Sequence, residues 1–129
     1  MMVTKITDGI KITVDTLYQP EYSNPEGEHF MYAYQIRIEN LSDYSIQLLR
    51  RQWIIFDSNG THREVEGEGV VGQQPLIGPG ENHEYVSGCN LRTEMGTMKG
   101  HYQMRRLIDG KLFDVNIPQF QLFCPYKMN

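Results

Sequence analysis

The sequence has 129 residues, of which 40% are apolar and 22% are charged, and its formal net charge is −4. This length and composition suit one globular domain over residues 1–129 and exclude a disordered chain. The negative charge argues against a broad nucleic-acid-binding surface, since such surfaces carry an excess of Lys and Arg.

The sequence shows no targeting or membrane segment. The N-terminal stretch MMVTKITDGIKITV lacks the apolar core of a signal peptide. The longest apolar run, Trp53 to Phe56, has four residues and is far too short to span a bilayer. We therefore expect a cytoplasmic protein that does not insert into membranes.

In chain order, the first elements are strands with an apolar face. In IKITV (10–14) and FMYAYQIRI (30–38), apolar or aromatic residues occupy every second position. This period of two is typical of half-buried strands. In all, strands are expected near residues 4–7, 10–18, 29–40, 44–57, 61–66, 82–89, 100–108 and 111–123. A short additional strand at 70–76 is an option.

Turn residues separate these strands. Residues 20–28 and 77–82 are rich in Pro and Gly and are expected to be loops. Asn59-Gly60 and Asp109-Gly110 are strong signals for β-hairpins.

The last hairpin can be given a register from its turn. A two-residue loop at 109–110 would pair Met104 with Val115 on an apolar face. It would also pair Arg105 with Asp114 on the opposite, polar face. Pro118 cannot donate a ladder hydrogen bond and predicts an edge or a bulge.

The expected architecture is an all-β, antiparallel β-sandwich. Short strands follow one another with frequent turns, and no long stretch shows a helical apolar stripe. A small barrel is the competing architecture. The sandwich is favoured because two packed sheets require strands that alternate apolar and polar side chains.

The segment GEGVVG matches G-x-G-x-x-G, with Gly67, Gly69 and Gly72 at the glycine positions. A dinucleotide fingerprint needs a helix after the glycines, and Pro75 and Pro79 argue against one. Three nearby glutamates also oppose a bound phosphate. We expect these glycines to serve bulges and turns, and keep a backbone site for another anion as the alternative.

No catalytic or metal site can be assigned from the remaining residues. The four histidines, His29, His62, His83 and His101, form no metal-binding spacing. Cys89 has no recognisable activating base. We expect Cys89 and Cys124 to be reduced and packed as small apolar residues, with a disulfide as the alternative.

Residues 67–104 carry a longer and more specific pattern. It consists of a loop (Gly67, Gly69, Val70, Val71, Gly72, Gln74, Pro75), a first strand (Pro79, Gly80, Tyr85, Ser87, Gly88, Cys89) and a second strand (Gly96, Met98, Gly100, Tyr102, Met104). This pattern resembles the signature of the ApaG domain family, also called CorD. The resemblance covers about residues 3–127.

The resemblance implies an immunoglobulin-like, fibronectin type III-like sandwich with no established enzymatic activity, so it assigns no catalytic residues. We also expect no metal ligands and no cofactor. It also implies an association with cobalt and magnesium homeostasis. In eukaryotic relatives the same domain is fused to other proteins and resembles an interaction module.

Two classes of function follow. The favoured one is a non-catalytic protein-interaction module with an unidentified protein partner, and homodimerisation through an edge strand stays open. The alternative is a binder of a nucleotide, pyrophosphate or divalent cation that uses the loop of Gly67, Gly69 and Gly72.

Overall fold

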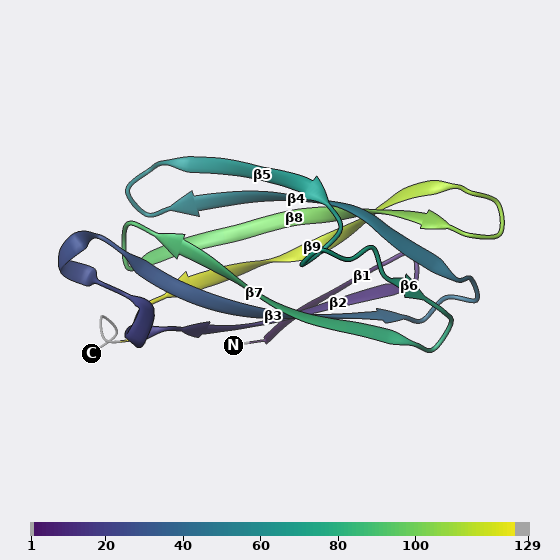
Figure 1. The fold of residues 1–129 in the computed structure, drawn as a ribbon, viewed down its shortest axis with the longest axis horizontal. Coiled ribbons are helices and arrows are strands. Elements are labelled where there is room, and N and C mark those ends of the chain that lie inside the picture. The colour runs from purple at the N-terminus through teal and green to yellow at the C-terminus, as the bar shows by residue number, and fades with distance from the viewer. Residues whose placement is uncertain (1, 126–129) are drawn as a thin grey trace.

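The structure is a computed structural model that describes residues 2–125. Its strands form two antiparallel sheets that pack face to face (Figure 1). One sheet has the strand order β1-β2-β3-β7, and the other has the order β5-β4-β8-β9, with β6 paired to β4. The predicted all-β, fibronectin type III-like sandwich is confirmed.

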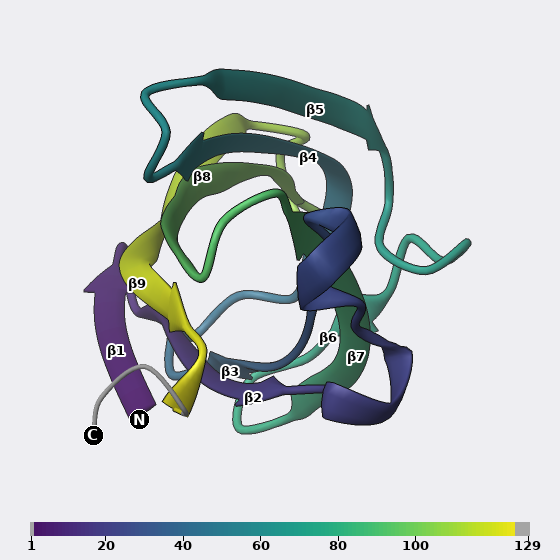
Figure 2. The same ribbon diagram turned by 90° about the vertical axis from the view of Figure 1, so that its left-hand side faces the viewer.

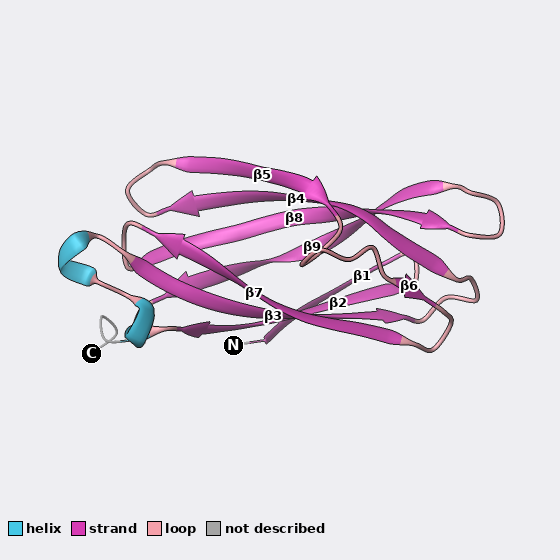
Figure 3. Ribbon diagram, viewed as in Figure 1, coloured by secondary structure: helices cyan, strands magenta, loops and turns pink. Residues whose placement is uncertain are grey.

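The strands follow the expected order along the chain. They are β1 (Met2–Thr7), β2 (Ile10–Tyr18), β3 (Phe30–Asn40), β4 (Ile46–Asp57), β5 (His62–Glu68), β6 (Leu76–Ile77), β7 (Asn82–Leu91), β8 (Met95–Arg106) and β9 (Leu112–Phe123). Two short 3-10 helices, η1 (Pro20–Tyr22) and η2 (Pro25–Gly27), lie in the loop expected at 20–28 (Figure 3). Among residues 2–125, no helix is long and apolar enough to cross a membrane.

The ends of most expected strands agree with those observed to within two residues, and two expected strands differ by more. Strand β8 begins at Met95, ahead of the expected start at residue 100. The option of a strand over 70–76 is wrong, because a tight turn between Val70 and Gln73 precedes the two-residue β6. The start of β8 was not predicted because Gly96 and Gly100 interrupt the alternation of apolar residues in this part of the sequence.

The period-two pattern of the sequence correctly identifies the core. Five alternate residues of β3, from Phe30 to Ile38, are buried between the sheets, as are Ile10, Ile12 and Val14 of β2. Each fully buried side chain of this size contributes about 1.5–3 kcal/mol relative to an exposed one. Apolar burial on facing strands therefore holds the two sheets together.

The predicted register of the last hairpin is wrong by two residues. Met104 lies opposite Phe113, not Val115. Arg105 donates to the side-chain oxygen of Gln47 at 2.8 Å, and not to Asp114. A shift of two keeps the same residues on each face, so the buried side of this hairpin was still predicted correctly.

A longer loop than expected explains the shift. Arg106 N–H donates to the carbonyl of Lys111, so this pair closes the hairpin. Leu107 N–H donates instead to the carbonyl of Ser45 at 3.0 Å, outside the hairpin. The Asp109 carboxylate accepts from the Arg106 guanidinium and from Lys111 N–H. These contacts hold a loop of four residues in place of the expected two.

The other turn and bulge predictions are confirmed. Strands β4 and β5 form a hairpin closed by Asp57 N–H, which donates to Thr61 O at 2.9 Å around Asn59-Gly60. The pairing of β8 with β9 shifts between Met98 and Gly100, opposite Pro118. Pro118, which has no N–H to donate to the ladder, therefore lies in a β-bulge.

Candidate functional site: the groove between β5 and β7

The sandwich is closed along one side and open along the other. On the closed side, Asn116 N–H of β9 donates to Thr7 Oγ1 of β1 at 3.3 Å. On the open side, β5 and β7 are edge strands, each paired with one neighbour only within residues 2–125. Figure 2 looks along the molecule and shows β5 across the top and β7 at the right, with the loop that follows β5 projecting on the right and β1 and β9 on the left.

A groove lies between these two edges. Two adjoining cavities of about 420 and 330 Å³ form it. We call it the β5–β7 groove, and its lining includes Tyr34, Arg51, Trp53, Arg63, Val65, Val71, Tyr85, Val86, Ser87 and Cys89. These residues come from β3, β4, β5, β7 and the loop after β5.

The floor of the groove is aromatic and rigidly packed. The rings of Tyr34 and Trp53 meet edge to face with centroids 5.5 Å apart. Trp53 also contacts Phe120 at 89° and 5.8 Å. Such edge-to-face pairs stabilise a core beyond the area that they bury. The floor is therefore a fixed surface on which polar groups are positioned.

Arg51 is a charged residue on the inner face of β4. A bulge between Leu48 and Arg50 shifts the alternation, so Arg51 points inward with Trp53 and Ile55. Its Nη1 donates to the carbonyls of Glu68 at 3.1 Å and Gly69 at 3.0 Å. The guanidinium thus lies at the base of the groove, against the end of β5.

Gly67 leaves room for this guanidinium. A Cβ on Gly67 would lie 3.0 Å from Arg51 Nη1 and 3.2 Å from Nη2. Gly67 is paired with Arg51 across the β4–β5 ladder. The first glycine of GEGVVG therefore serves the placement of a side chain on the neighbouring strand.

Gly69 and Gly72 serve the tight turn that follows. Gly69 has φ +65°, and a Cβ there would lie 2.2 Å from Gln73 O. Val70 and Gln73 exchange N–H to carbonyl hydrogen bonds of 2.8 and 3.0 Å around Val71 and Gly72. The structure agrees with the expectation that these glycines serve backbone geometry, and β6 follows them where a dinucleotide site would need a helix.

Val71 occupies an unfavourable backbone conformation at the tip of this turn. Its φ is +46°, in the left-handed region where β-branched residues are rare. Its side chain is 64% exposed, so it gains little from packing. Val86 of β7, 59% exposed, lines the same end of the groove. Together, Val71 and Val86 form an apolar rim beside Arg51.

Burial keeps the tyrosine hydroxyls and the cysteine thiol at the groove in their neutral forms. Burial raises the pKa of Tyr85 and of Tyr102, whose hydroxyls share a hydrogen bond. Burial also raises the pKa of the Cys89 thiol, although Arg63 Nη2 lies 3.5 Å from its sulfur and opposes the shift. The groove thus offers uncharged hydroxyl and thiol groups beside two permanent cations.

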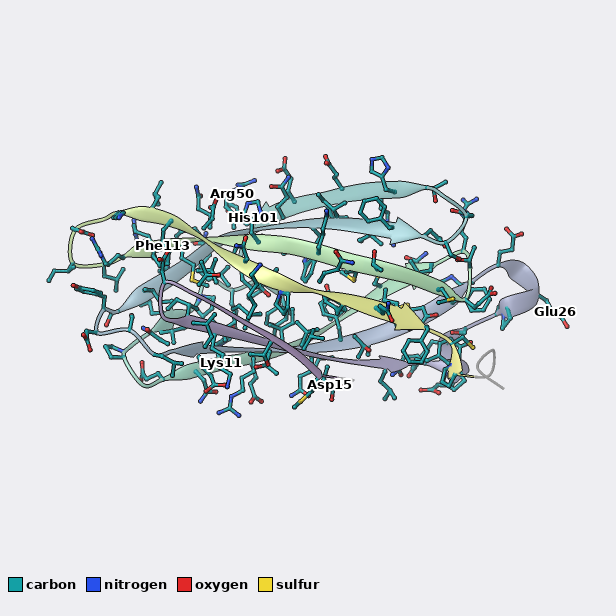
Figure 4. The ribbon with its side chains drawn as sticks, turned by 180° about the vertical axis from the view of Figure 1, so that it is seen from behind. Lys11, Asp15, Glu26, Arg50, His101 and Phe113 are labelled. Atoms are coloured by element: carbon teal, nitrogen blue, oxygen red, sulfur yellow. The ribbon has the colours of Figure 1, made fainter. Side chains whose placement is uncertain are left out.

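The other residues considered from the sequence do not gather at one place. Across residues 2–125, no three His, Cys, Asp or Glu side chains come close enough together to hold a metal ion. The His62 ring packs against Phe56 at a tilt of 35°, with centroids 5.6 Å apart, and His101 lies on the outer face near Arg50 (Figure 4). Cys89 and Cys124 are both buried and unlinked.

Comparison with known proteins identifies the family. The profile described as the ApaG domain matches residues 20–106, which include the whole glycine loop and β7. The chain belongs to the ApaG domain family. The ApaG protein of Pseudomonas paraeruginosa is 51% identical over 116 residues, which cover 90% of this chain and 91% of that protein. The ApaG protein of Proteus mirabilis is 47% identical over 122 residues, covering 93% and 95% of the two chains.

Solved structures agree with the ApaG fold. The crystal structure of the putative ApaA protein from Bordetella pertussis superposes with a TM-score of 0.87 at 43% identity. The match covers 90% of this chain and 94% of that chain. The C-terminal domain of wzt superposes with a TM-score of 0.55 at 9% identity and shares the fold alone.

Sequence reasoning found the loop of this ApaG domain but missed the groove beside it. The signal for Arg51 was present, since R-Q-W-I-I places Arg51 two residues before Trp53 and therefore on the same face of a strand. A charged residue that lies two positions from a buried residue of the same strand points to the same, buried face. Arg63 and Val86 carried no such signal, because their importance depends on how β5 and β7 face each other.

Proposed function

We propose that this protein is a non-catalytic interaction module that binds a partner protein at the β5–β7 groove. The observation that carries the proposal is the strained, exposed Val71 at the rim of a groove between two free strand edges. Strained residues persist where a function requires them, and an exposed apolar tip suits contact with another protein.

The chemistry of the groove supports binding without catalysis. The Tyr85 and Tyr102 hydroxyls donate and accept hydrogen bonds but resist ionisation. Arg51 and Arg63 are permanent cations and cannot serve as bases. We extend the proposal to the family's association with cobalt and magnesium homeostasis, in which the protein would act by binding another protein.

A small ligand is the second candidate function. Arg51 at the base of the groove and positive φ angles at Gly69, Val71 and Gly72 favour a nucleotide, pyrophosphate or other anion. Two features oppose it. Val70 and Gln73 N–H already bond within the turn, and Glu68 lines the same cavity as Arg51, which disfavours a multiply charged phosphate more strongly than a single carboxylate.

Site-specific cross-linking distinguishes the two. A photoreactive residue at position 86 should capture one stoichiometric protein partner in cells, whereas the same residue at position 4, where Thr4 is exposed on the closed side of the sandwich, should not. In parallel, purified protein is titrated with ATP, pyrophosphate, Mg²⁺ and Co²⁺ while amide NMR signals are followed. Saturable shifts confined to residues 67–73, with no capture at position 86, would contradict the interaction module.

A further inference from the structure

We infer that the β5–β7 groove takes an acidic, extended segment of the partner, which adds as a strand to the free edge of β7 and places a carboxylate on Arg51. This inference rests on the proposed function and specifies the partner's chemistry. Three independent features carry it: the free backbone of β7, the unequal protection of the two edges, and the guanidinium of Arg51, which forms no ion pair within residues 2–125.

The middle of β7 presents free backbone groups to the groove. Odd-numbered residues of β7, such as Tyr85 and Ser87, lie opposite even-numbered residues of β3. Asn40 N–H donates to Glu81 O, so Glu81 and Asn40 occupy a hydrogen-bonded position of this ladder. Because such positions recur at every second residue of an antiparallel ladder, the N–H and carbonyl groups of the odd-numbered residues point to β3. Among residues 2–125, the N–H and carbonyl groups of Glu84, Val86 and Gly88 therefore have no strand partner.

The carbonyl of Asn90 shows that this edge accepts hydrogen bonds from across the groove. This carbonyl lies on the same side as those of Glu84, Val86 and Gly88, and it accepts from Arg63 Nη2 at 2.6 Å. Arg63 thus bridges β5 and β7 at this end, since its Nη2 also lies 3.5 Å from Cys89 Sγ. Further along, the edge of β7 stays open to a strand that would use the same side.

The two edges are protected to different extents. Strand β5 carries Glu64, Glu66 and Glu68, all exposed, and rows of charge keep other strands away from an edge. The corresponding part of β7 carries Val86 and Gly88, which have no charge, and the carboxylate of Glu84 is paired with Arg37 at 3.4 Å. An incoming strand is therefore directed to β7, with β5 as the opposite wall.

Arg51 selects a carboxylate among the side chains of such a strand. In the part of the chain that the structure describes, Nη1 alone of its nitrogens bonds to protein groups, and Arg51 lines both cavities of the groove. Within residues 2–125, none of the ion pairs includes Arg51, Arg63 or Arg92. A partly buried guanidinium binds a carboxylate through paired, charge-assisted hydrogen bonds. The apolar rim of Val71 and Val86 favours apolar residues next to that carboxylate.

A displayed library of random linear 12-residue peptides provides the probe. It is selected in parallel on the wild type and on Arg51→Gln. Peptides enriched on the wild type should share an Asp or Glu beside apolar residues. Synthetic versions should bind Arg51→Gln at least about tenfold more weakly, and Arg51→Lys should recover only part of the loss, because a single ammonium replaces the planar fork.

Arg50→Gln is the matched control, because Arg50 is the adjacent cation and points to the outer face (Figure 4). It should leave peptide affinity unchanged. Bound peptide should also slow hydrogen exchange at the amides of Val86 and Gly88, as strand addition requires. Thermal melts of each variant establish that it is folded, and Gly67→Ala provides a second way to displace the guanidinium.

The outcomes separate this inference from the proposed function. One outcome is peptides that slow hydrogen exchange at the Val86 amide yet bind Arg51→Gln as tightly as the wild type. That result would overturn the carboxylate contact but not the proposal that the groove binds a partner protein. Strand addition would be overturned if no peptides were enriched, or if the enriched peptides shifted only NMR signals far from β7. The interaction module is tested separately, by cross-linking at position 86. Micromolar pyrophosphate or ATP binding that depends on Arg51 would replace the peptide with a phosphate ligand.

Discussion

The guanidinium of Arg51 lies against the backbone of Gly67, where a Cβ would come within 3.0 Å of Nη1. We predict that Gly67→Ala displaces the guanidinium while changing the free energy of unfolding by less than about 1 kcal/mol. The obstructing atoms belong to the end of a flexible side chain, and Ala also restricts the unfolded chain. The Arg51 side-chain NMR signal should move, and denaturant melts should not. An unchanged Arg51 signal would contradict this relationship.

Gly69 should tolerate substitution much less well. Gly69→Ala combines a φ of +65° with a Cβ 2.2 Å from Gln73 O, and backbone atoms cannot move aside as a side chain can. We expect a loss of more than about 1 kcal/mol of stability. Gly60→Ala is the control, because Gly60 also has positive φ, at +92°, but open space around it. Equal losses in urea unfolding would mean that the Gln73 contact is unimportant.

Val71 should be replaceable with a gain in stability. A left-handed conformation costs an L-residue roughly 1–2 kcal/mol, and Asn tolerates it better than Val. Val71→Asn should therefore raise the free energy of unfolding by up to about 1 kcal/mol while weakening partner capture. Val86→Asn should weaken capture without that gain, because Val86 sits in a strand that favours β-branched residues. A destabilised Val71→Asn protein would argue against strain at the tip.

The corrected register of the last hairpin has energetic consequences. Met104 is fully buried, so Met104→Ala should cost about 2–5 kcal/mol. Asp114→Ala should cost under about 1 kcal/mol, because Asp114 is exposed and forms none of the ion pairs found within residues 2–125. A double-mutant cycle between Arg105 and Asp114 should give coupling near zero. A strong coupling energy between Arg105 and Asp114 would instead support the register predicted from a two-residue turn.

Cys89 should react slowly with alkylating reagents at neutral pH. Burial raises the pKa of its thiol, so the reactive thiolate is scarce until the pH rises above the ordinary thiol range. In a Cys124→Ala variant, labelling of Cys89 should be slow at pH 7 and should accelerate with rising pH and in urea. Rapid labelling of the folded protein at pH 7 would show that the groove exposes an activated thiol.

Much of the sandwich follows from local patterns. The alternation from Phe30 to Ile38 predicts a buried strand face because side chains point to opposite sides of a strand in turn, whatever the partner. Gly69 and Gly72 predict turns for a similar reason, since only a residue without a Cβ adopts positive φ freely. Pro118 likewise predicts its bulge, because it lacks an N–H.

The groove and the hairpin register depend on contacts between distant segments. Leu107 N–H bonds to Ser45 O, far away in sequence, and this bond enlarges a loop that Asp109-Gly110 would otherwise close in two residues. Arg51 becomes a site residue only because β5 and β7 end up as facing edges of different sheets. Strand order is set by the packing of all strands at once, so no local pattern could place Arg51, Val71 and Val86 around one cavity.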